Sequence, residues 1–580
     1  MTWPRAGRWL DRLNGVIGLV AIAVVLTKVG FYVPLYADEL LNATVRLIGA
    51  LFLVQELARP LTPLRAGTWR EHLRERHTEL LAAALIAVGE MLQLLNQQGS
   101  VLADASVFLM GVTQAVVLAR LAIDWLRRSR WLSSMGISPS RVFILSFCVP
   151  IALGTLALQM PRATYQGIAW VDALFTVVSA VCVTGLATVD VPGTFTFLGQ
   201  AIILILIQVG GLGIMTLTLT LGTMLSAGLG IRERTLLADW LSEDRIGSVR
   251  TLLLRIATFT FIIEMAGAVV LFINLPSAPM DLWQRVWYSL FHAVSAFCNA
   301  GFSIFSGNLY EPVVQGQWLH QGTIMVLIVL GGLGFPVLSD LWDAMQARRR
   351  GYSPGRRLLS VTTRLVLAST ALLLLGGTLG MWWFERSVSM AAVAPLEQWW
   401  HAAFWSVTAR TAGFNAWPTE SLSSLGSLFM MALMWVGGSP MSTAGGAKTL
   451  TIAVLFLSMR AVALGKARIE VFGREVPAAS VLKAASVATG GMLVVCLGAL
   501  ALIALEPARS ALDLCFEAVS AWGTVGLSRA LTPQLSEASK LVVVGLMFVG
   551  RMGILTMLAA IGAHRKQFDY KLLPENIPIS

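Results

Sequence analysis

The chain has 580 residues, of which 56% are hydrophobic and 13% are charged, and its mean hydropathy is +0.72. A water-soluble surface cannot be built from such a composition, which excludes a soluble globular protein and indicates a membrane protein surrounded by lipids. The net charge of +11 comes from basic residues in short loops between apolar runs, so we expect no nucleic-acid partner. Five scattered cysteines indicate neither a disulfide framework nor a paired metal site.

Residues 1–138 are predicted to form an accessory N-terminal membrane region. A helix needs about 20 apolar residues to cross roughly 30 Å of hydrocarbon, and four runs in this region approach that length. The first run follows three arginines, but no small-residue cleavage site comes after it, so we expect a retained membrane helix rather than a signal peptide. The four runs cover about 14–34, 43–58, 79–96 and 104–125.

An internal repeat organises the rest of the chain. Four similar segments contain Gly185, Gly301, Gly413 and Gly526, which follow one another at intervals of 116, 112 and 113 residues. Each segment is an apolar run too short to cross a membrane, and it lies between two longer runs. The second long runs cover about 197–225, 323–345, 425–459 and 540–562. The predicted units are 139–226, 246–346, 358–460 and 476–565, followed by a cytoplasmic tail at 566–580.

This organisation predicts an all-α polytopic membrane protein. Each of its four pseudo-symmetric units contains a span, a re-entrant pore helix with a filter loop, and a second span. The units surround one central pore, and about four extra spans precede them. Non-helical backbone at membrane depth is tolerated only where protein buries it or an aqueous pathway passes, so the short elements indicate a pore.

The glycine motifs are predicted to form a selectivity filter. A potassium ion that enters a narrow passage exchanges its water for fixed oxygens, and backbone carbonyls of glycine-containing loops supply them. The alternative for any single glycine is close helix packing. The predicted filter residues are Cys182, Val183, Thr184, Gly185, Cys298, Asn299, Ala300, Gly301, Arg410, Thr411, Ala412, Gly413, Gly523, Thr524, Val525 and Gly526.

Charge placement predicts the orientation. Basic residues concentrate in the loops that join one unit to the next, and such loops face the cytoplasm. The loops beside the short elements contain few basic residues, so the glycine motifs should open outward and both termini should be cytoplasmic. The basic clusters are at 59–77, 127–130, 348–350, 356–357 and 460–474.

Two departures from the repeat predict a gate. Glycine pairs, a proline and three hydroxyl residues interrupt the third unit's second span, which favours an unwound segment over a simple helix kink. In the fourth unit, Arg551 lies deep in an apolar span, where a charge is costly without a role; a structural salt bridge is the alternative. The predicted gate residues are Gly437, Gly438, Ser439, Pro440, Ser442, Thr443, Ala444, Gly445, Gly446, Lys448 and Arg551.

With these motifs, residues 139–580 resemble the Trk/Ktr/HKT family of potassium transporters, and in particular the bacterial Ktr and Trk membrane subunits. The resemblance implies K⁺ as the transported ion, held at the filter residues, because Gly185 goes with potassium. It also implies an intramembrane gating loop, with Arg551 as a positive barrier beneath the filter. The chain departs from the family pattern at Met441, where glycine is usual, and at Ser580.

The resemblance further implies a bacterial cytoplasmic membrane location, a homodimer, and a separate cytoplasmic RCK-type nucleotide-binding regulatory subunit. No cofactor is expected in this chain, since the glycine clusters at 210–213 and 331–334 lie inside spans and lack a strand-turn-helix setting.

Two other functions remain open at this point. One is a sodium-permeable transporter of the same family, or one with Na⁺ as coupling or activating ion. The other is a polytopic membrane enzyme, which would need convergent His, Asp or Glu side chains that the sequence does not indicate. Glu264, Glu385 and Glu517 either attract cations, serve as structural hydrogen-bond acceptors or lie at the membrane interface.

Overall fold

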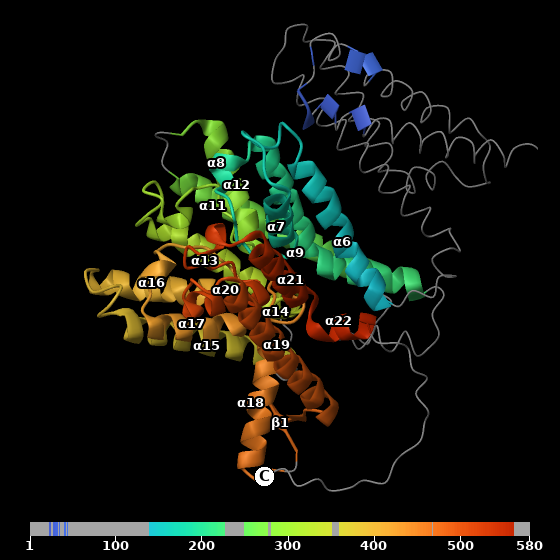
Figure 1. The fold of residues 1–580 in the computed structure, drawn as a ribbon. Helices are drawn as coiled ribbons and strands as arrows, with labels where there is room; N and C mark the ends of the chain where they lie inside the picture. The colour runs from blue at the N-terminus through green and yellow to red at the C-terminus, as the bar shows by residue number, and fades with distance from the viewer. Residues whose placement is uncertain are drawn as a thin grey trace, which may run out of the picture.

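The computed structural model describes residues 139–226, 249–275, 280–350, 359–466 and 468–561, with a few positions between 23 and 44. Most of the predicted N-terminal region, including its second to fourth spans, and the tail at 566–580 lie outside the described residues. Figure 1 shows that the described chain is helical throughout, apart from one small hairpin. In the described residues its strands are β1 (Glu470–Val471) and β2 (Arg474–Glu475).

Each predicted unit begins with a long helix. Three stretches in these helices are long and apolar enough to cross a membrane: Leu254–Asn274, Val361–Glu385 and Ala478–Leu505. The start of the third helix is fixed by Ser360, whose hydroxyl accepts a hydrogen bond from the Thr363 N–H. The four helices are α6 (Pro139–Leu158), α11 (Val249–Asn274), α15 (Val361–Glu385) and α19 (Ala478–Leu505).

A shorter helix follows in each unit and stops at the glycine motif. Each of these helices packs against the long helix that precedes it. They are α7 (Trp170–Val181), α12 (Leu282–Phe297), α16 (Pro395–Thr408) and α20 (Ala511–Gly523). A single short turn of helix then lies on the way to the next long element in each unit: α8 (Val191–Thr194), η3 (Asn308–Tyr310), η4 (Thr419–Ser421) and η5 (Thr532–Gln534).

The second long elements differ among the units. Only the first is one helix, and the apolar runs expected at 323–345 and 540–562 are each divided into two helices, which the sequence had not indicated. The physical reason is Gly334 and Gly553, whose φ angles of +88° and +78° are left-handed and end the preceding helix. The bend at Gly334 is 98°. The elements are α9 (Phe197–Ser226), α13 (Trp318–Leu333) with α14 (Phe335–Arg349), α17 (Ser424–Trp435) with α18 (Thr449–Ala463), and α21 (Glu537–Met552) with α22 (Ile554–Ile561).

The four units close into a ring. The second helix of each unit contacts the short helix of the next, in the pairs α9–α12, α13–α16, α17–α20 and α21–α7. At the last junction Lys540 and Asp172 form an ion pair of 2.6 Å. Four apolar clusters fill the four junctions, so burial of apolar side chains holds the ring together.

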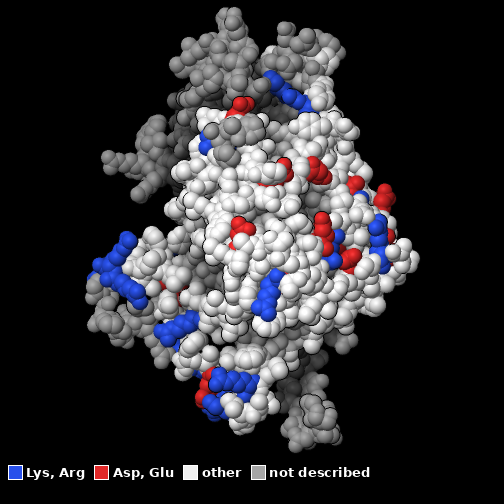
Figure 2. All heavy atoms as spheres, turned by 90° about the vertical axis from the view of Figure 1, so that its left-hand side faces the viewer, with Lys and Arg blue, Asp and Glu red and all other residues white. Residues whose placement is uncertain are grey.

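One part of the structure extends beyond the ring. Helix α18 and the beginning of α19 run side by side to the hairpin of β1 and β2 (Figure 1). On the face in Figure 2 most of the surface is uncharged, acidic side chains lie mainly in the upper half, and basic side chains predominate towards the lower end.

Candidate functional site

The four glycine motifs meet at the centre of the ring. A Cβ atom added to Gly185 would lie 2.5 Å from the Ala300 carbonyl oxygen, and one added to Gly301 would lie 2.6 Å from the Ala412 oxygen. The same contact joins Gly413 to the Val525 oxygen at 2.6 Å and Gly526 to the Thr184 oxygen at 2.1 Å. The order is cyclic and returns to the first motif. Only glycine fits at these four positions, because any side chain would collide with backbone.

The backbone of the motifs is strained in the same way four times. The residue two places before each glycine has a φ between +49° and +66°, although none of the four is a glycine. Such a conformation costs about 1–2 kcal/mol per residue. Repeated strain of this kind persists only where the surrounding structure imposes it, and it clusters at functional sites. The four residues are Val183, Asn299, Thr411 and Thr524.

Each short helix has a hydroxyl residue near its end, and in three of the four units this hydroxyl anchors the motif. The Ser179 hydroxyl accepts a hydrogen bond from the Gly185 N–H at 3.0 Å. The Ser295 and Thr408 hydroxyls donate to backbone carbonyls of Phe302 and Phe414, both at 2.7 Å. The hydroxyl of the fourth member, Ser520, has no hydrogen-bond partner among the described residues. These residues were missing from the predicted site, although the Val-Ser-Ala and Val-Thr-Ala pattern in the repeat marks them.

The third motif is tied to its helix differently from the others. Its Ala412 N–H donates to the carbonyl four residues earlier, at 3.0 Å. The matching bond spans five residues in the other motifs, as between Thr184 N–H and Ser179 O at 2.8 Å. The third segment is one residue shorter in sequence, and the shorter bond absorbs that deletion.

Glycines in the second helices support the ring from one side. A Cβ on Gly210, Gly331 or Gly550 would lie 1.9–2.1 Å from the last carbonyls of the short helices, at Val181, Phe297 and Trp522. Each of these glycines precedes a second one, except in the fourth unit, where Arg551 takes that place. The helices therefore approach the motifs as closely as backbone allows, and the arginine is the exception.

In the third unit the helix is interrupted below the ring. Helix α17 ends at Trp435 and α18 begins at Thr449, so the segment from 436 to 448 is non-helical. We refer to this segment as the loop. Its backbone is satisfied inside the protein: the Gly437 N–H donates to the Ala447 carbonyl at 2.8 Å, and the Ser439 N–H donates to the Gly332 carbonyl at 3.0 Å. The loop is thus folded on itself and fixed to the second unit.

Three basic side chains bind carbonyl oxygens of the loop. Arg410 donates to Gly437 O at 3.2 Å, and Lys448 donates to Ala444 O at 2.5 Å. Arg551 donates to Thr443 O and, at 2.7 Å, to Gly210 O in the first unit. In the described part of the chain no carboxylate lies within ion-pair distance of these side chains. Buried charges then depend on carbonyl dipoles for stabilisation.

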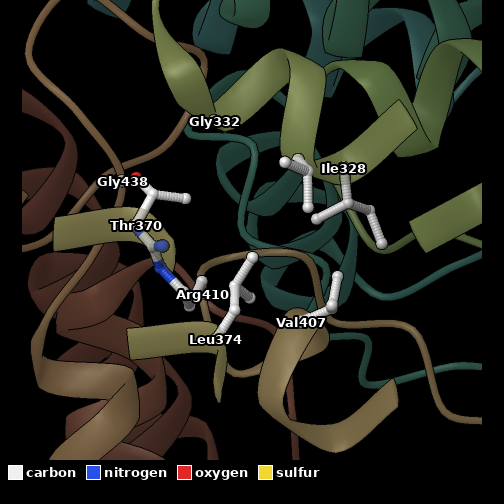
Figure 3. A pocket seen from close by; sticks show the side chains of 8 residues that line it. Ile328, Gly332, Thr370, Leu374, Val407, Arg410 and Gly438 are labelled. Atoms are coloured by element: carbon white, nitrogen blue, oxygen red, sulfur yellow. The ribbon is translucent and has the colours of Figure 1, made fainter. Parts of the chain in front are cut away.

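The predicted filter residue Arg410 does not present its side chain to the glycine ring. Figure 3 shows the side chain extending from the end of α16, near Val407, towards Gly438 of the loop. Its backbone belongs to the third motif, but the residue is buried and its guanidinium contacts the loop. The other predicted filter residues lie in the ring segments, and the predicted gate residues lie in the loop or against it.

The buried carboxylates are bound to uncharged donors. Glu264 accepts from the Gln208 amide at 3.2 Å, and Glu517 accepts from the hydroxyls of Ser528 and Thr532. Glu385 accepts from the Ser423 N–H at 3.1 Å and from the Ser423 hydroxyl. Of these alternatives, the hydrogen bonds favour a structural role for all three.

Comparison with known proteins identifies the class. A family model described as TrkH, a cation transport protein, matches residues 125–567. The chain is 36% identical to the Ktr system potassium uptake protein B of Bacillus subtilis, over 75% of this chain and 95% of that protein. It is 34% identical to the potassium/sodium uptake protein NtpJ of Enterococcus hirae, over 76% of this chain and 97% of the relative.

A solved structure shares the fold. The potassium transporter TrkH from Vibrio parahaemolyticus superposes with a TM-score of 0.58 at 18% identity, covering 89% of this chain and 98% of the other. The protein is therefore a multi-pass membrane protein of an ion-transporter class rather than of an enzyme class. It belongs to the TrkH cation transport protein family. The predicted family and the helical membrane fold are confirmed; the unit boundaries and the roles of the site residues stay predictions.

Proposed function

We propose that the chain is the ion-translocating subunit of a potassium uptake system, with a gated, cation-selective pore through its centre. The observation that carries the proposal is the closed ring of four glycine motifs. Each motif glycine contacts the carbonyl of the residue that precedes the glycine of the next motif. The relatives named for potassium uptake support the choice of ion.

The ring supplies what a dehydrating cation needs. Carbonyl oxygens of Thr184, Ala300, Ala412 and Val525 lie at the contacts between neighbouring motifs. Backbone oxygens replace the water of a potassium ion without a full negative charge that would trap it. The short helices end at the motifs, so the partial negative charge of each C-terminus adds to the attraction for a cation. Uptake of this kind requires no cofactor and no covalent chemistry.

The membrane potential supplies the driving force. Each 100 mV is worth about 2.3 kcal/mol per monovalent ion, which corresponds to roughly fiftyfold accumulation. The charge distribution supports the expected direction, because the basic lower end in Figure 2 would face the cytoplasm of a bacterial cell and the ring would open outward.

The loop and Arg551 form the gate in this proposal. A fixed positive charge beneath the ring repels an ion that leaves it, and the loop obstructs the path. Arg551 bonds both Thr443 O in the loop and Gly210 O in the first unit, so it holds the loop against the opposite wall. Opening would require the loop and the arginine to separate.

Partners are part of the same proposal. The Ktr relatives are named as proteins of a system, which supports a multi-component assembly. We expect a homodimer whose basic inner loops receive a cytoplasmic RCK-type nucleotide-binding ring.

The function can be tested in a bacterium that lacks its own potassium uptake systems. We expect the chain to restore growth at low potassium and to increase rubidium uptake. Failure to restore either, with confirmed expression in the membrane, would contradict the proposal.

A second candidate is a sodium-permeable or sodium-coupled transporter, since one relative is named a potassium/sodium uptake protein. Sodium flux, and potassium flux with and without sodium, separate the two. Gly185→Ser should loosen discrimination against sodium, because the added side chain forces the ring away from the Ala300 carbonyl. Unchanged selectivity would show that Gly185 does not belong to the filter.

A further inference from the structure

One residue of the loop departs from what its backbone favours. Met441 has a φ of +55°, in the left-handed region that glycine adopts readily and that other residues rarely adopt. A residue stays in such a conformation only when its surroundings hold it there. Contacts of Met441 with its surroundings must therefore hold this backbone conformation.

The Met441 side chain packs into an apolar cluster outside its own unit. The buried residues of that cluster are Ile256 in α11, Phe297 at the end of the second unit's short helix, and Phe335 at the start of α14. Phe297 and Phe335 are in edge contact, with ring centroids 6.3 Å apart. The side chain thus joins the loop to the second unit by apolar contact.

The backbone of Met441 makes a second attachment at the same place. Its carbonyl accepts a hydrogen bond from the Phe335 N–H at 3.1 Å and so caps the first turn of α14. This is the point where α13 and α14 bend by 98° at Gly334. A Cβ on Gly334 would lie 2.6 Å from the Pro440 carbonyl, so the loop and the bend are in direct contact.

A third attachment lies two residues further along the loop. The Thr443 hydroxyl donates to the Phe297 carbonyl at 3.2 Å, at the end of the short helix that leads into the second motif. The side chain of Met441, the carbonyl of Met441 and the hydroxyl of Thr443 therefore all hold the loop to the second unit. Arg551 holds it to the first and fourth units instead.

We infer that Met441 is a positioning residue that latches the loop in its obstructing place by packing its side chain against Ile256, Phe297 and Phe335. The inference rests on the proposed function, in which the loop is part of the gate. The latch opposes release of the loop, because moving the loop exposes the apolar side chain and uncaps α14.

The test uses the purified full chain in lipid vesicles with an imposed potential and rubidium as the probe. Met441→Ala removes the side chain beyond Cβ and keeps the unfavourable φ, whereas Met441→Gly removes the side chain and relieves the φ. We expect both variants to raise rubidium uptake by about tenfold, since Met441 is half-buried and its packing biases a two-state equilibrium. Met441→Leu, which keeps an apolar side chain, should lie closer to the unsubstituted protein than to Met441→Ala.

A matched control is Phe472→Gly. Phe472 also has a left-handed φ, of +47°, but it is 47% exposed at the hairpin turn outside the ring. This change should leave rubidium uptake unaltered. The ratio of rubidium to sodium uptake should also stay constant in the Met441 variants, because the latch acts on the loop and not on the ring.

The outcomes separate the two levels of the argument. If the unsubstituted protein takes up no rubidium, the proposed function fails. If it does so and Met441→Ala, inserted and thermally stable, gives the same or lower uptake, the latch is wrong while the proposed function stands. A rise in Met441→Gly without a rise in Met441→Ala would also overturn the latch, because it would assign the effect to the backbone alone.

Discussion

The ring of glycine motifs and the loop beneath it use backbone carbonyl oxygens in different ways. In the ring, four near-identical segments leave carbonyl oxygens at the contacts between neighbours, and Arg410, Lys448 and Arg551 donate to other carbonyls than these. In the loop, carbonyl oxygens are occupied by the protein's own cations on Arg410, Lys448 and Arg551. The four repeated motifs therefore form a site that can receive a cation. The segments that depart from the repeat form a site that already holds the protein's own cations and would exclude another.

The largest effect is expected from a side chain placed in the ring. A Cβ on Gly526 would lie 2.1 Å from the Thr184 carbonyl, and the glycine φ is +90°. Gly526→Ala should therefore abolish rubidium uptake. Gly545→Ala is the matched control, since its Cβ meets nothing within 4 Å, and it should retain uptake. Equal uptake by both variants would show that the close packing of the four glycine motifs is not needed for transport.

A large effect in the opposite direction is expected beneath the ring. Arg551→Gln removes the charge that binds Thr443 O and Gly210 O, and we expect uptake to rise by about tenfold, the change that 1.4 kcal/mol produces in a two-state equilibrium. Arg255→Gln removes an exposed arginine paired with Asp343 and serves as the control. Reduced uptake by a folded Arg551→Gln protein would argue against a barrier.

A smaller effect distinguishes the hydroxyls that anchor a motif from the unpartnered hydroxyl of Ser520. Ser179→Ala removes the acceptor of the Gly185 N–H and should lower the potassium-to-sodium uptake ratio about fivefold, the equivalent of one hydrogen bond of about 1 kcal/mol. Ser520→Ala removes a hydroxyl that has no partner among the described residues, so its ratio should change less. The reverse order would show that the anchors do not set the ring geometry.

The smallest effect concerns stability outside both regions. Glu506, just after α19, accepts from the Ser536 N–H at 2.8 Å and from the Ser539 hydroxyl at 2.9 Å, and hydrogen bonds of this kind hold the pKa of its carboxyl below the ordinary value of 4.5. A lowered folded-state pKa stabilises the protein above the unfolded-state pKa, and this contribution is lost as the pH falls through the folded-state pKa. The melting temperature should thus fall less on acidification in Glu506→Gln, as thermal unfolding in detergent at pH 7 and pH 4 would show. An identical fall in both proteins would exclude this contribution.

The features that recur in all four repeats could be predicted from the sequence. The family, the helical membrane fold and the meeting of short helices with glycine motifs follow from four copies in phase, because the same local preference expressed four times outweighs chance. The interruption near Pro440 was also predictable, since proline disrupts a helix and the glycine pairs on either side of it weaken one further.

Other features depend on contacts that the sequence does not show. The breaks at Gly334 and Gly553 were missed because glycine is tolerated inside a helix, and the contact between Gly334 and the Pro440 carbonyl of the loop cannot be inferred from the sequence. The side-chain direction of Arg410 was missed for the same reason. The position of Arg410 in the third glycine motif predicted a place at the ring. Its side chain instead binds the Gly437 carbonyl, 27 residues further along the chain.

The most direct test of the central claim is the position of a bound ion. Rubidium has a strong anomalous signal, so a crystal of the protein grown or soaked with rubidium locates the permeant ion. The account predicts anomalous density on the axis of the ring, coordinated by the carbonyl oxygens of Thr184, Ala300, Ala412 and Val525. Rubidium bound elsewhere along the protein with the ring empty, in a preparation that takes up rubidium, would contradict it.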